Sequence, residues 1–255
     1  MLMAYGRLNL PYDVVGLQYC NYEGDKISKS RNWGIFCEKV VESGLDPDIW
    51  RYYLTYLIPE TKDTEFKWDE FENRVNNELV ANIGNFVHRT LTFTSNFLAG
   101  VVEPTEPGAE ERELKKNVLE EVERADVAFQ EVRIRDAMKS ILQISTLGNE
   151  YFQRSQPWVL IKQDPQRCRQ VIYACVDVCR ILAILLSPYL PASSERIYGF
   201  LRLPGKPSWE ALSVPLARVE IEKPQILFKK LEKPEIERIK SIVTRSTDAE
   251  DYFRQ

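Results

Sequence analysis

Apolar residues recur at helical spacing over most of this chain, and one long stripe dominates the pattern. From about Trp68 onward, apolar side chains return every three, four or seven residues. The members of this stripe are Phe71, Val75, Leu79, Ile83, Phe86 and Phe93. An α-helix turns once in about 3.6 residues, so this spacing places them on one face. We therefore expect a long amphipathic helix that begins near residue 68.

The rest of the chain predicts further helices with short connections. Gly100 and the segment 104–108 indicate a turn. Helices are expected over 109–129 and 132–152, from Asp164-Pro165 through the apolar run before Pro188, and after Pro191. Residues 218–221 alternate like a strand, and Lys233-Pro234 opens a last helix. Long helices joined by short loops are typical of an antiparallel bundle.

The first part of the chain has a different character. Residues 1–25 contain short apolar pieces broken by Pro11 and Gly16, which predict strands and loops. A short helix is expected over 31–43, with Gly44 as its stop. Asp46 then caps a helix that has Pro47 at its first position and runs to Pro59. The predicted fold class is mainly α: a small α/β segment followed by an antiparallel helical bundle.

Composition narrows the possible chemistry. The chain has 255 residues, a net charge of −4, and no apolar run long enough to cross a membrane. No signal peptide is recognisable, so we expect a cytoplasmic protein. Five cysteines without a CxxC pair favour buried reduced thiols over a metal site, including Cys175 and Cys179. The single histidine, His88, excludes a histidine zinc triad and gives no support for a Ser-His-Asp triad.

A compact cationic loop is the most informative local motif. Residues 26–30 read K-I-S-K-S, with two lysines three positions apart and small hydroxyl residues around them. Lysine side chains are long, mobile point charges that suit a phosphate. An exposed polar loop without function explains the bare motif equally well. The flanking residues decide between these interpretations.

Those flanks resemble the second signature region, KMSKS, of class I methionyl-tRNA synthetases. The matching stretches are N-L-P-Y-D at 9–13 and N-Y-E-G-D-K-I-S-K-S-R at 21–31, with Ile27 in place of the methionine. The similarity extends from about Tyr5 to Leu231 and includes D-I-W-R-Y-Y-L at 48–54 and R-I-R-D-A-M at 133–138. The family's nucleotide-binding fold, with its HIGH signature and zinc-bearing insertion, has no counterpart here.

The resemblance implies a domain order. Residues 1–62 would form the KMSKS-loop and stem-contact segment, and 63–215 the helical anticodon-binding domain. Residues 216–255 would form a strand and a helix that pack back on the core.

The resemblance also implies roles for the loop. Lys26 and Lys29 would be catalytic and contact the pyrophosphate moiety of ATP, while Ser28 and Ser30 would fix the loop in the ATP site. Positioned cations match the negative charge that grows on leaving pyrophosphate. Arg31 extends the basic patch or is simply a surface residue.

Anticodon recognition is implied for three residues. Asn85 and Arg89 lie four positions apart and therefore share a helix face. Spacing alone favours a solvated face, but the family reads the anticodon with Asn and Arg at this spacing. Trp158 follows Pro157 and by itself suggests a packed tryptophan; in the family such a tryptophan stacks beside the wobble cytosine. Lys162 is a candidate phosphate contact, and Arg133, Arg135 and Lys139 receive no role.

The resulting hypothesis is part of a methionine-tRNA ligase. The partners implied are tRNA(Met) with a CAU anticodon, and methionine and ATP in the intact enzyme, with Mg²⁺ expected there and no metal site in this chain. Neither a membrane nor DNA is an expected partner. The chain is either a fragment or the partner of a separate N-terminal half, and alone it should not aminoacylate. A stand-alone tRNA-binding module is the alternative, and a purely structural helical protein is a third possibility.

Overall fold

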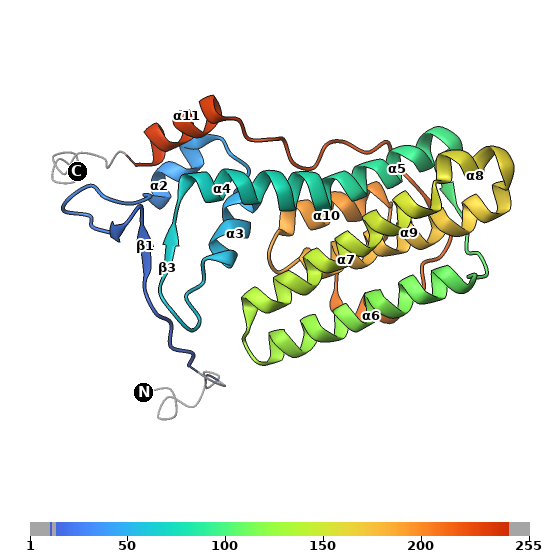
Figure 1. Ribbon diagram of the computed structural model, residues 1–255, viewed down its shortest axis with the longest axis horizontal. Coiled ribbons are helices and arrows are strands. Elements are labelled where there is room, and N and C mark those ends of the chain that lie inside the picture. The colour runs from blue at the N-terminus through green and yellow to red at the C-terminus, as the bar shows by residue number, and fades with distance from the viewer. Residues whose placement is uncertain (1–10, 12–13, 245–255) are drawn as a thin grey trace.

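The computed structural model describes Pro11 and residues 14–244. A small sheet with short helices forms one end of an elongated molecule, and a helical bundle forms the rest (Figure 1). The predicted mainly α fold, with a small α/β segment before the bundle, is therefore confirmed. The matching stretch N-L-P-Y-D at 9–13 lies, except for Pro11, outside the described residues.

The small sheet has three strands in the order β2-β1-β3. Strand β1 (Cys20–Tyr22) pairs antiparallel with β2 (Asp25–Lys26) and parallel with β3 (Thr64–Phe66). Glu23 and Gly24 connect β1 to β2 with positive φ angles of 45° and 85°. Two such residues form the tight turn that matches the twist of a hairpin. This hairpin brings Lys26 to the edge of the sheet.

Two short helical stretches follow. Helix α2 (Cys37–Val40) and the 3-10 turn η1 (Val41–Ser43) end at Gly44, whose φ of 69° confirms the predicted stop. The expected start at residue 31 was wrong, because residues 28 and 33 pair through their backbones and hold the chain in a turn. Helix α3 (Pro47–Tyr56) begins as predicted, with Asp46 accepting from the Asp48 amide at 3.0 Å, but it ends three residues before Pro59.

The long helix predicted from Trp68 exists and has three parts. They are α4 (Trp68–Arg74), the π-helical segment η2 (Val75–Gly84) and α5 (Asn85–Phe97). All six side chains of the predicted stripe are buried. Four of them follow one another at four-residue intervals, which exceeds the 3.6 residues of an α-helical turn. The wider π turns keep this stripe directed at the core, a feature that the spacing did not predict.

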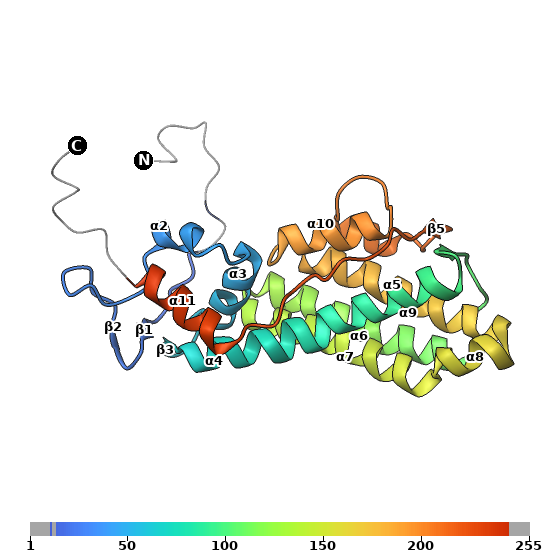
Figure 2. The same ribbon diagram turned by 90° about the horizontal axis from the view of Figure 1, so that it is seen from above.

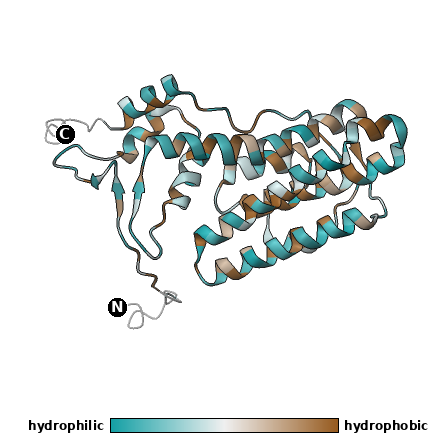
Figure 3. Ribbon diagram, in the orientation of Figure 1, coloured by the Kyte–Doolittle hydropathy of each residue, from teal (hydrophilic) through white to brown (hydrophobic). Residues whose placement is uncertain are grey.

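The bundle consists of long helices that reverse direction one after another. They are α6 (Ala109–Gln130), α7 (Ile134–Ser155), α8 (Pro157–Gln163), α9 (Pro165–Leu186) and α10 (Pro191–Phe200). Helix α9 lies at the centre and is hydrophobic along most of its length (Figure 3). Strand β4 (Val101–Val102) pairs antiparallel with β5 (Val219–Glu220), close to the predicted strand at 218–221. The 3-10 turn η3 (Trp209–Ser213) precedes β5.

The last segment returns along the bundle to the sheet end, as seen from above (Figure 2). The Asn76 side chain both donates to and accepts from the Leu231 backbone, at 2.8 Å each, and so holds this segment on η2. Helix α11 (Lys233–Val243) then packs on α2 and η1. There the Phe36 amide donates to the Val243 carbonyl at 3.0 Å, and Arg238 donates to the Ser43 carbonyl at 3.0 Å.

Helices α5 and α7 approach each other closely at Gly148. A Cβ added at Gly148 of α7 would come within 2.5 Å of the Phe86 ring of α5. Phe86 is fully buried, so its ring is surrounded by other protein atoms. Only glycine at position 148 therefore allows these two helices to lie so close together.

We predict that Gly148→Ala lowers the free energy of unfolding by about 1–3 kcal/mol, because the added methyl group overpacks the core. Urea unfolding followed by circular dichroism measures the change. Gly199→Ala is the matched control, since Gly199 lies in α10 with no atom within 4 Å of the added Cβ. That substitution should raise stability by about 0.4–1 kcal/mol. Equal effects of the two substitutions would contradict the close approach.

Candidate nucleotide and tRNA sites

The lysine loop is a tight turn held by its own backbone. Ser28 and Trp33 exchange two backbone hydrogen bonds, of 2.8 and 2.9 Å, and the Asn32 amide donates to the Lys29 carbonyl at 3.1 Å. Asn32 adopts φ 52°, a conformation that asparagine tolerates better than most residues. The turn therefore presents Lys29 and Ser30 at its tip.

An aromatic cluster anchors the base of this loop. The Trp33 indole donates to the Tyr22 carbonyl at 2.9 Å, and its ring meets the Tyr22 ring edge-on at 5.4 Å. The Tyr22 hydroxyl in turn accepts from the buried Trp68 indole at 2.8 Å. Trp50 and Trp68 are buried, whereas Trp33 is 37% exposed and Trp209 is half-buried.

Charge in the loop is divided between paired and unpaired groups. Arg31 forms an ion pair with Asp25 at 2.7 Å, and this hydrogen bond is the main reason that the pKa of Asp25 is lowered. Lys26 and Lys29 are exposed, and neither forms an ion pair with any residue of the described chain. The two lysines therefore keep their positive charge available, whereas that of Arg31 is largely neutralised.

The small residues of the loop pack against each other. The Ser28 and Ser30 hydroxyls lie 3.3 Å apart, within hydrogen-bonding distance. Gly34 has φ 147°, and a Cβ there would come within 3.0 Å of Ile27 Cγ2. Ile27 therefore packs over the Gly34 backbone, although 55% of its surface is exposed.

Three polar contacts join α5 and its π-helical start to α7. The side-chain amide of Asn82 donates to Thr146 Oγ1 at 3.1 Å. The side-chain amide of Asn85 donates to Asn149 Oδ1 at 3.4 Å. The Arg89 guanidinium donates to Gln153 Oε1 at 3.0 Å. Each pair is separated by 64 residues, so the two helices run parallel here. Asn85 and Arg89 thus share one exposed face, as their spacing predicted, and α7 orients both side chains.

Arg89 and Trp158 are brought together through a third side chain. The Arg89 guanidinium lies 4.3 Å from the centre of the Phe152 ring, and the Phe152 and Trp158 ring centres lie 6.2 Å apart. Trp158 is the second residue of α8 and is 40% exposed. Partial burial lowers the pKa of Arg89 from its ordinary value. The three predicted anticodon residues therefore belong to one surface.

Asn85 and Arg89 line a shallow hollow between α5 and α7, and Trp158 lies outside that lining. The described lining of this hollow is Ala81, Asn82, Asn85, Arg89, Thr146, Asn149, Glu150, Gln153 and Arg154. Amide and guanidinium groups can donate to and accept from exposed base edges, and a flat indole can stack on a base. Such groups suit an unpaired nucleic-acid loop.

Sequence reasoning missed the supporting residues on α7. Asn149 and Gln153 are four positions apart, like Asn85 and Arg89, but pairing two such motifs requires knowing that α5 and α7 are neighbours. Phe152 looked like an ordinary core residue, and it is 3% exposed. Its second role, as the contact between Arg89 and Trp158, comes from its position and not from its residue type.

The two candidate sites lie at opposite ends of the molecule. The β1–β2 hairpin that carries the lysine loop is at one end of the long axis, and α8 with Trp158 is at the other (Figure 1). The long helix α4–η2–α5 runs between them, and the view from above agrees (Figure 2).

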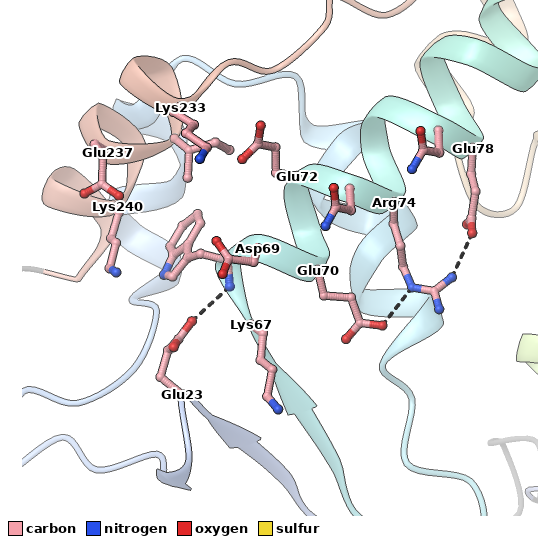
Figure 4. A pocket seen from close by; sticks show the side chains of 14 residues that line it. Glu23, Lys67, Asp69, Glu70, Glu72, Arg74, Glu78, Lys233, Glu237 and Lys240 are labelled. Carbon is pink, nitrogen blue, oxygen red and sulfur yellow. Dashed lines mark hydrogen bonds and ion pairs between the residues drawn. The ribbon is translucent and has the colours of Figure 1, made fainter.

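A groove of about 860 Å³ contains neither site. It lies between α11 and the α4–η2 region, and its side chains are mostly charged (Figure 4). Arg74 bridges Glu70 at 3.0 Å and Glu78 at 2.8 Å, and Glu23 accepts from the Trp68 amide at 2.9 Å. Many of these charges are thus already paired within the protein.

The cysteines of the bundle are buried free thiols. Cys168, Cys175 and Cys179 are fully buried, and burial raises the pKa of each, that of Cys168 to about 11. Cys20 is half-buried and Cys37 is exposed, so the prediction of buried thiols was wrong for these two.

Within residues 14–244, no group of three or more His, Cys, Asp or Glu side chains could hold a metal ion. No described helix is both long and apolar enough to span a membrane.

Two family models match the chain. The model for class I tRNA synthetases (M) matches residues 1–91. The model for the anticodon binding domain of methionyl tRNA ligase matches residues 101–245, which is more than half of the sequence.

Curated relatives are similar over nearly all of this chain. Methionine–tRNA ligase of Pyrococcus abyssi is 40% identical, over 90% of this chain and 33% of the relative. Methionine–tRNA ligase of Methanopyrus kandleri is 37% identical, over 95% of this chain and 36% of the relative. The chain thus spans about a third of the length of these relatives.

Solved structures of a methionyl-tRNA synthetase are also similar to this chain. The apo form of Mycobacterium tuberculosis methionyl-tRNA synthetase matches with a TM-score of 0.78 and 26% identity, over 91% of this chain and 46% of that one. The same enzyme bound by methionyl-adenylate matches with a TM-score of 0.79 and 26% identity, over 89% of this chain and 46% of that one. The chain therefore belongs to the methionyl-tRNA synthetase family, of which it represents a C-terminal portion.

Proposed function

We propose that this chain supplies the KMSKS loop and the anticodon-reading surface of a methionine–tRNA ligase, which uses ATP to attach methionine to tRNA(Met). The observation that carries the proposal is the row Arg89–Phe152–Trp158 beside the Asn85 amide. A stacking ring and hydrogen-bonding groups on one exposed surface match the needs of single-stranded RNA recognition.

In the proposed anticodon complex, Trp158 stacks beside the wobble cytosine of a CAU anticodon. Asn85 contributes both a donor and an acceptor to the edge of a base, and Arg89 contributes a fork of donors. Gln153 and Asn149 hold these two side chains before the tRNA arrives. Such preorganisation reduces the conformational entropy that binding must remove.

At the other end, the lysine loop acts on ATP. The methionine carboxylate attacks the α-phosphate, and pyrophosphate leaves with increasing negative charge. Lys26 and Lys29 stabilise that charge, while Ser28 and Ser30 maintain the turn. The Mg²⁺ that commonly accompanies ATP in such reactions would bind the phosphates rather than a protein site of this chain.

The remaining parts of the catalytic site come from elsewhere in the intact enzyme. The ATP cradle and the methionine pocket belong to the portion that precedes this region in the family, either in the same polypeptide or as a separate N-terminal half. The chain alone does not aminoacylate. We also propose that the enzyme works in the cytoplasm, where tRNA is charged for translation.

Trp158→Ala should weaken binding of methionine tRNA by about fivefold or more, because stacking on one base contributes about 1–3 kcal/mol. The measurement is a fluorescence titration of purified chain with labelled tRNA, beside the same tRNA with its wobble cytosine changed. The unaltered chain should prefer the natural anticodon, and Trp158→Ala should lose most of that preference.

Trp33→Ala is the matched control for this experiment, because Trp33 is exposed to a similar degree but lies at the lysine loop. It should leave tRNA affinity within about twofold. Equal binding of both tRNAs by the unaltered chain, falling steeply with salt, would mean phosphate contact only and would refute anticodon reading.

Lys29→Ala should abolish most methionine activation when the chain is combined with the preceding portion of the Pyrococcus abyssi relative. We expect kcat for ATP–pyrophosphate exchange to fall by about 10²–10³-fold, the usual result of removing one group that stabilises transition-state charge. Binding of tRNA should not change.

Lys39→Ala provides the comparison, since the Lys39 ammonium already pairs with Glu42 at 3.0 Å. Exchange activity should survive that substitution. If Lys29→Ala also retained full activity, the role of the loop would be wrong. Tight anticodon-dependent binding without any restored exchange would favour the alternative of a stand-alone tRNA-binding module.

A further inference from the structure

One buried carboxylate lies at the same end of the bundle as Trp158. Glu111, in the first turn of α6, is 3% exposed. Its Oε1 accepts from the Tyr151 hydroxyl of α7, and its Oε2 pairs with Arg167 of α9 at 2.6 Å. Oε2 also accepts from the Gly108 amide at 2.9 Å. A single side chain therefore joins three helices.

Glu111 Oε2 lies close to both the Gly108 backbone and Arg167. A Cβ at Gly108 would lie 2.7 Å from Glu111 Oε2 and 3.3 Å from Arg167 NH1. Burial by itself would raise the pKa of Glu111, but hydrogen bonds from Arg167 and Tyr151 hold it below its ordinary value. The group is therefore a buried, fully paired carboxylate whose loss would remove the acceptor of the Gly108 amide and the Tyr151 hydroxyl, whereas Arg167 would keep its ion pair with Glu110 at 2.7 Å.

Both partners of Glu111, Tyr151 and Arg167, are close in sequence to helix α8, which contains Trp158. Tyr151 directly precedes Phe152, whose ring contacts both Arg89 and Trp158. Arg167 lies in the first turn of α9, immediately after α8, and the next residue, Cys168, contacts the Pro157 carbonyl at 3.6 Å. The segment 152–166 thus lies between two contacts of Glu111, one with Tyr151 before it and one with Arg167 after it.

We propose that Glu111 is a positioning residue for anticodon recognition: by tying Tyr151 to Arg167, it holds α8 so that Trp158 stands against Phe152. The inference rests on the proposed function of Trp158 in binding the anticodon. Helix α8 has only seven residues. Gln156, the residue before it, adopts the left-handed conformation, with φ 47°. So short a helix depends on such tertiary contacts to stay in place.

The first test measures the order of α8 without tRNA. In Glu111→Ala, hydrogen–deuterium exchange of the amides in 156–164 should become at least about fivefold faster, while exchange in α4 stays unchanged. Glu121→Ala is the matched control, because Glu121 is 9% exposed on the same helix and pairs with Arg124 of that helix. Unchanged exchange in 156–164 would overturn the proposal.

The second test is a double-mutant cycle on tRNA affinity. Glu111→Ala should weaken binding of methionine tRNA at least about threefold, and it should cause no further loss in a Trp158→Ala background, because coupled residues are not additive. Independent, multiplying losses would mean general destabilisation and would overturn the proposal. Glu121→Ala should leave affinity within about twofold.

Two further outcomes concern a Glu111 variant that does not fold and a Trp158 variant that does not change tRNA affinity. If Glu111→Ala does not fold, Glu111→Gln replaces it, since the amide keeps the shape and removes only the charge that pairs with Arg167. Exchange of the amides in 156–164 should still become faster than in Glu121→Ala, and equal exchange would overturn the proposal. If Trp158→Ala alone leaves affinity unchanged, the proposed anticodon function fails. In that case faster exchange in 156–164 would still establish that Glu111 orders α8, and unchanged exchange would refute it.

Discussion

The contact between Phe86 and Gly148 sets the distance and the register between α5 and α7. The Phe86 ring occupies the space that any side chain at position 148 would need. This close approach brings the next residues along both helices within hydrogen-bonding distance, so that Asn85 meets Asn149 and Arg89 meets Gln153. A different residue at position 148 would separate the helices and break the polar contacts on which the exposed surface depends.

The α4–η2–α5 helix connects this surface with the lysine loop. Its first residue, Trp68, donates to the Tyr22 hydroxyl beneath the loop, and its last third carries Asn85 and Arg89. The returning segment adds a second connection, because Asn76 clamps Leu231 and α11 then packs on α2. The loop with Lys26 and Lys29 and the surface with Asn85 and Arg89 therefore lie at opposite ends of one continuous helix (Figure 1).

Local signals predicted the elements well wherever a single residue controls the backbone. Gly44 stops a helix because it adopts φ 69°, and Asp46 starts the next because its carboxylate accepts from a backbone amide. Prediction failed where distant or non-α contacts intervened. The helix expected from residue 31 begins only at Cys37, since Ser28 and Trp33 pair first, and the π-helical η2 was not recognised within an otherwise correct helix.

The sequence by itself determined the residue types, their spacing on each helix and the family to which they belong. It indicated that Asn85 and Arg89 share a face, because that follows from helical periodicity alone. Only the tertiary structure decided that Gln153 orients Arg89, that Phe152 connects it to Trp158, and that Asp25 neutralises Arg31. The physical reason is that periodicity is a local property of the backbone, whereas these contacts depend on how side chains from distant segments pack together.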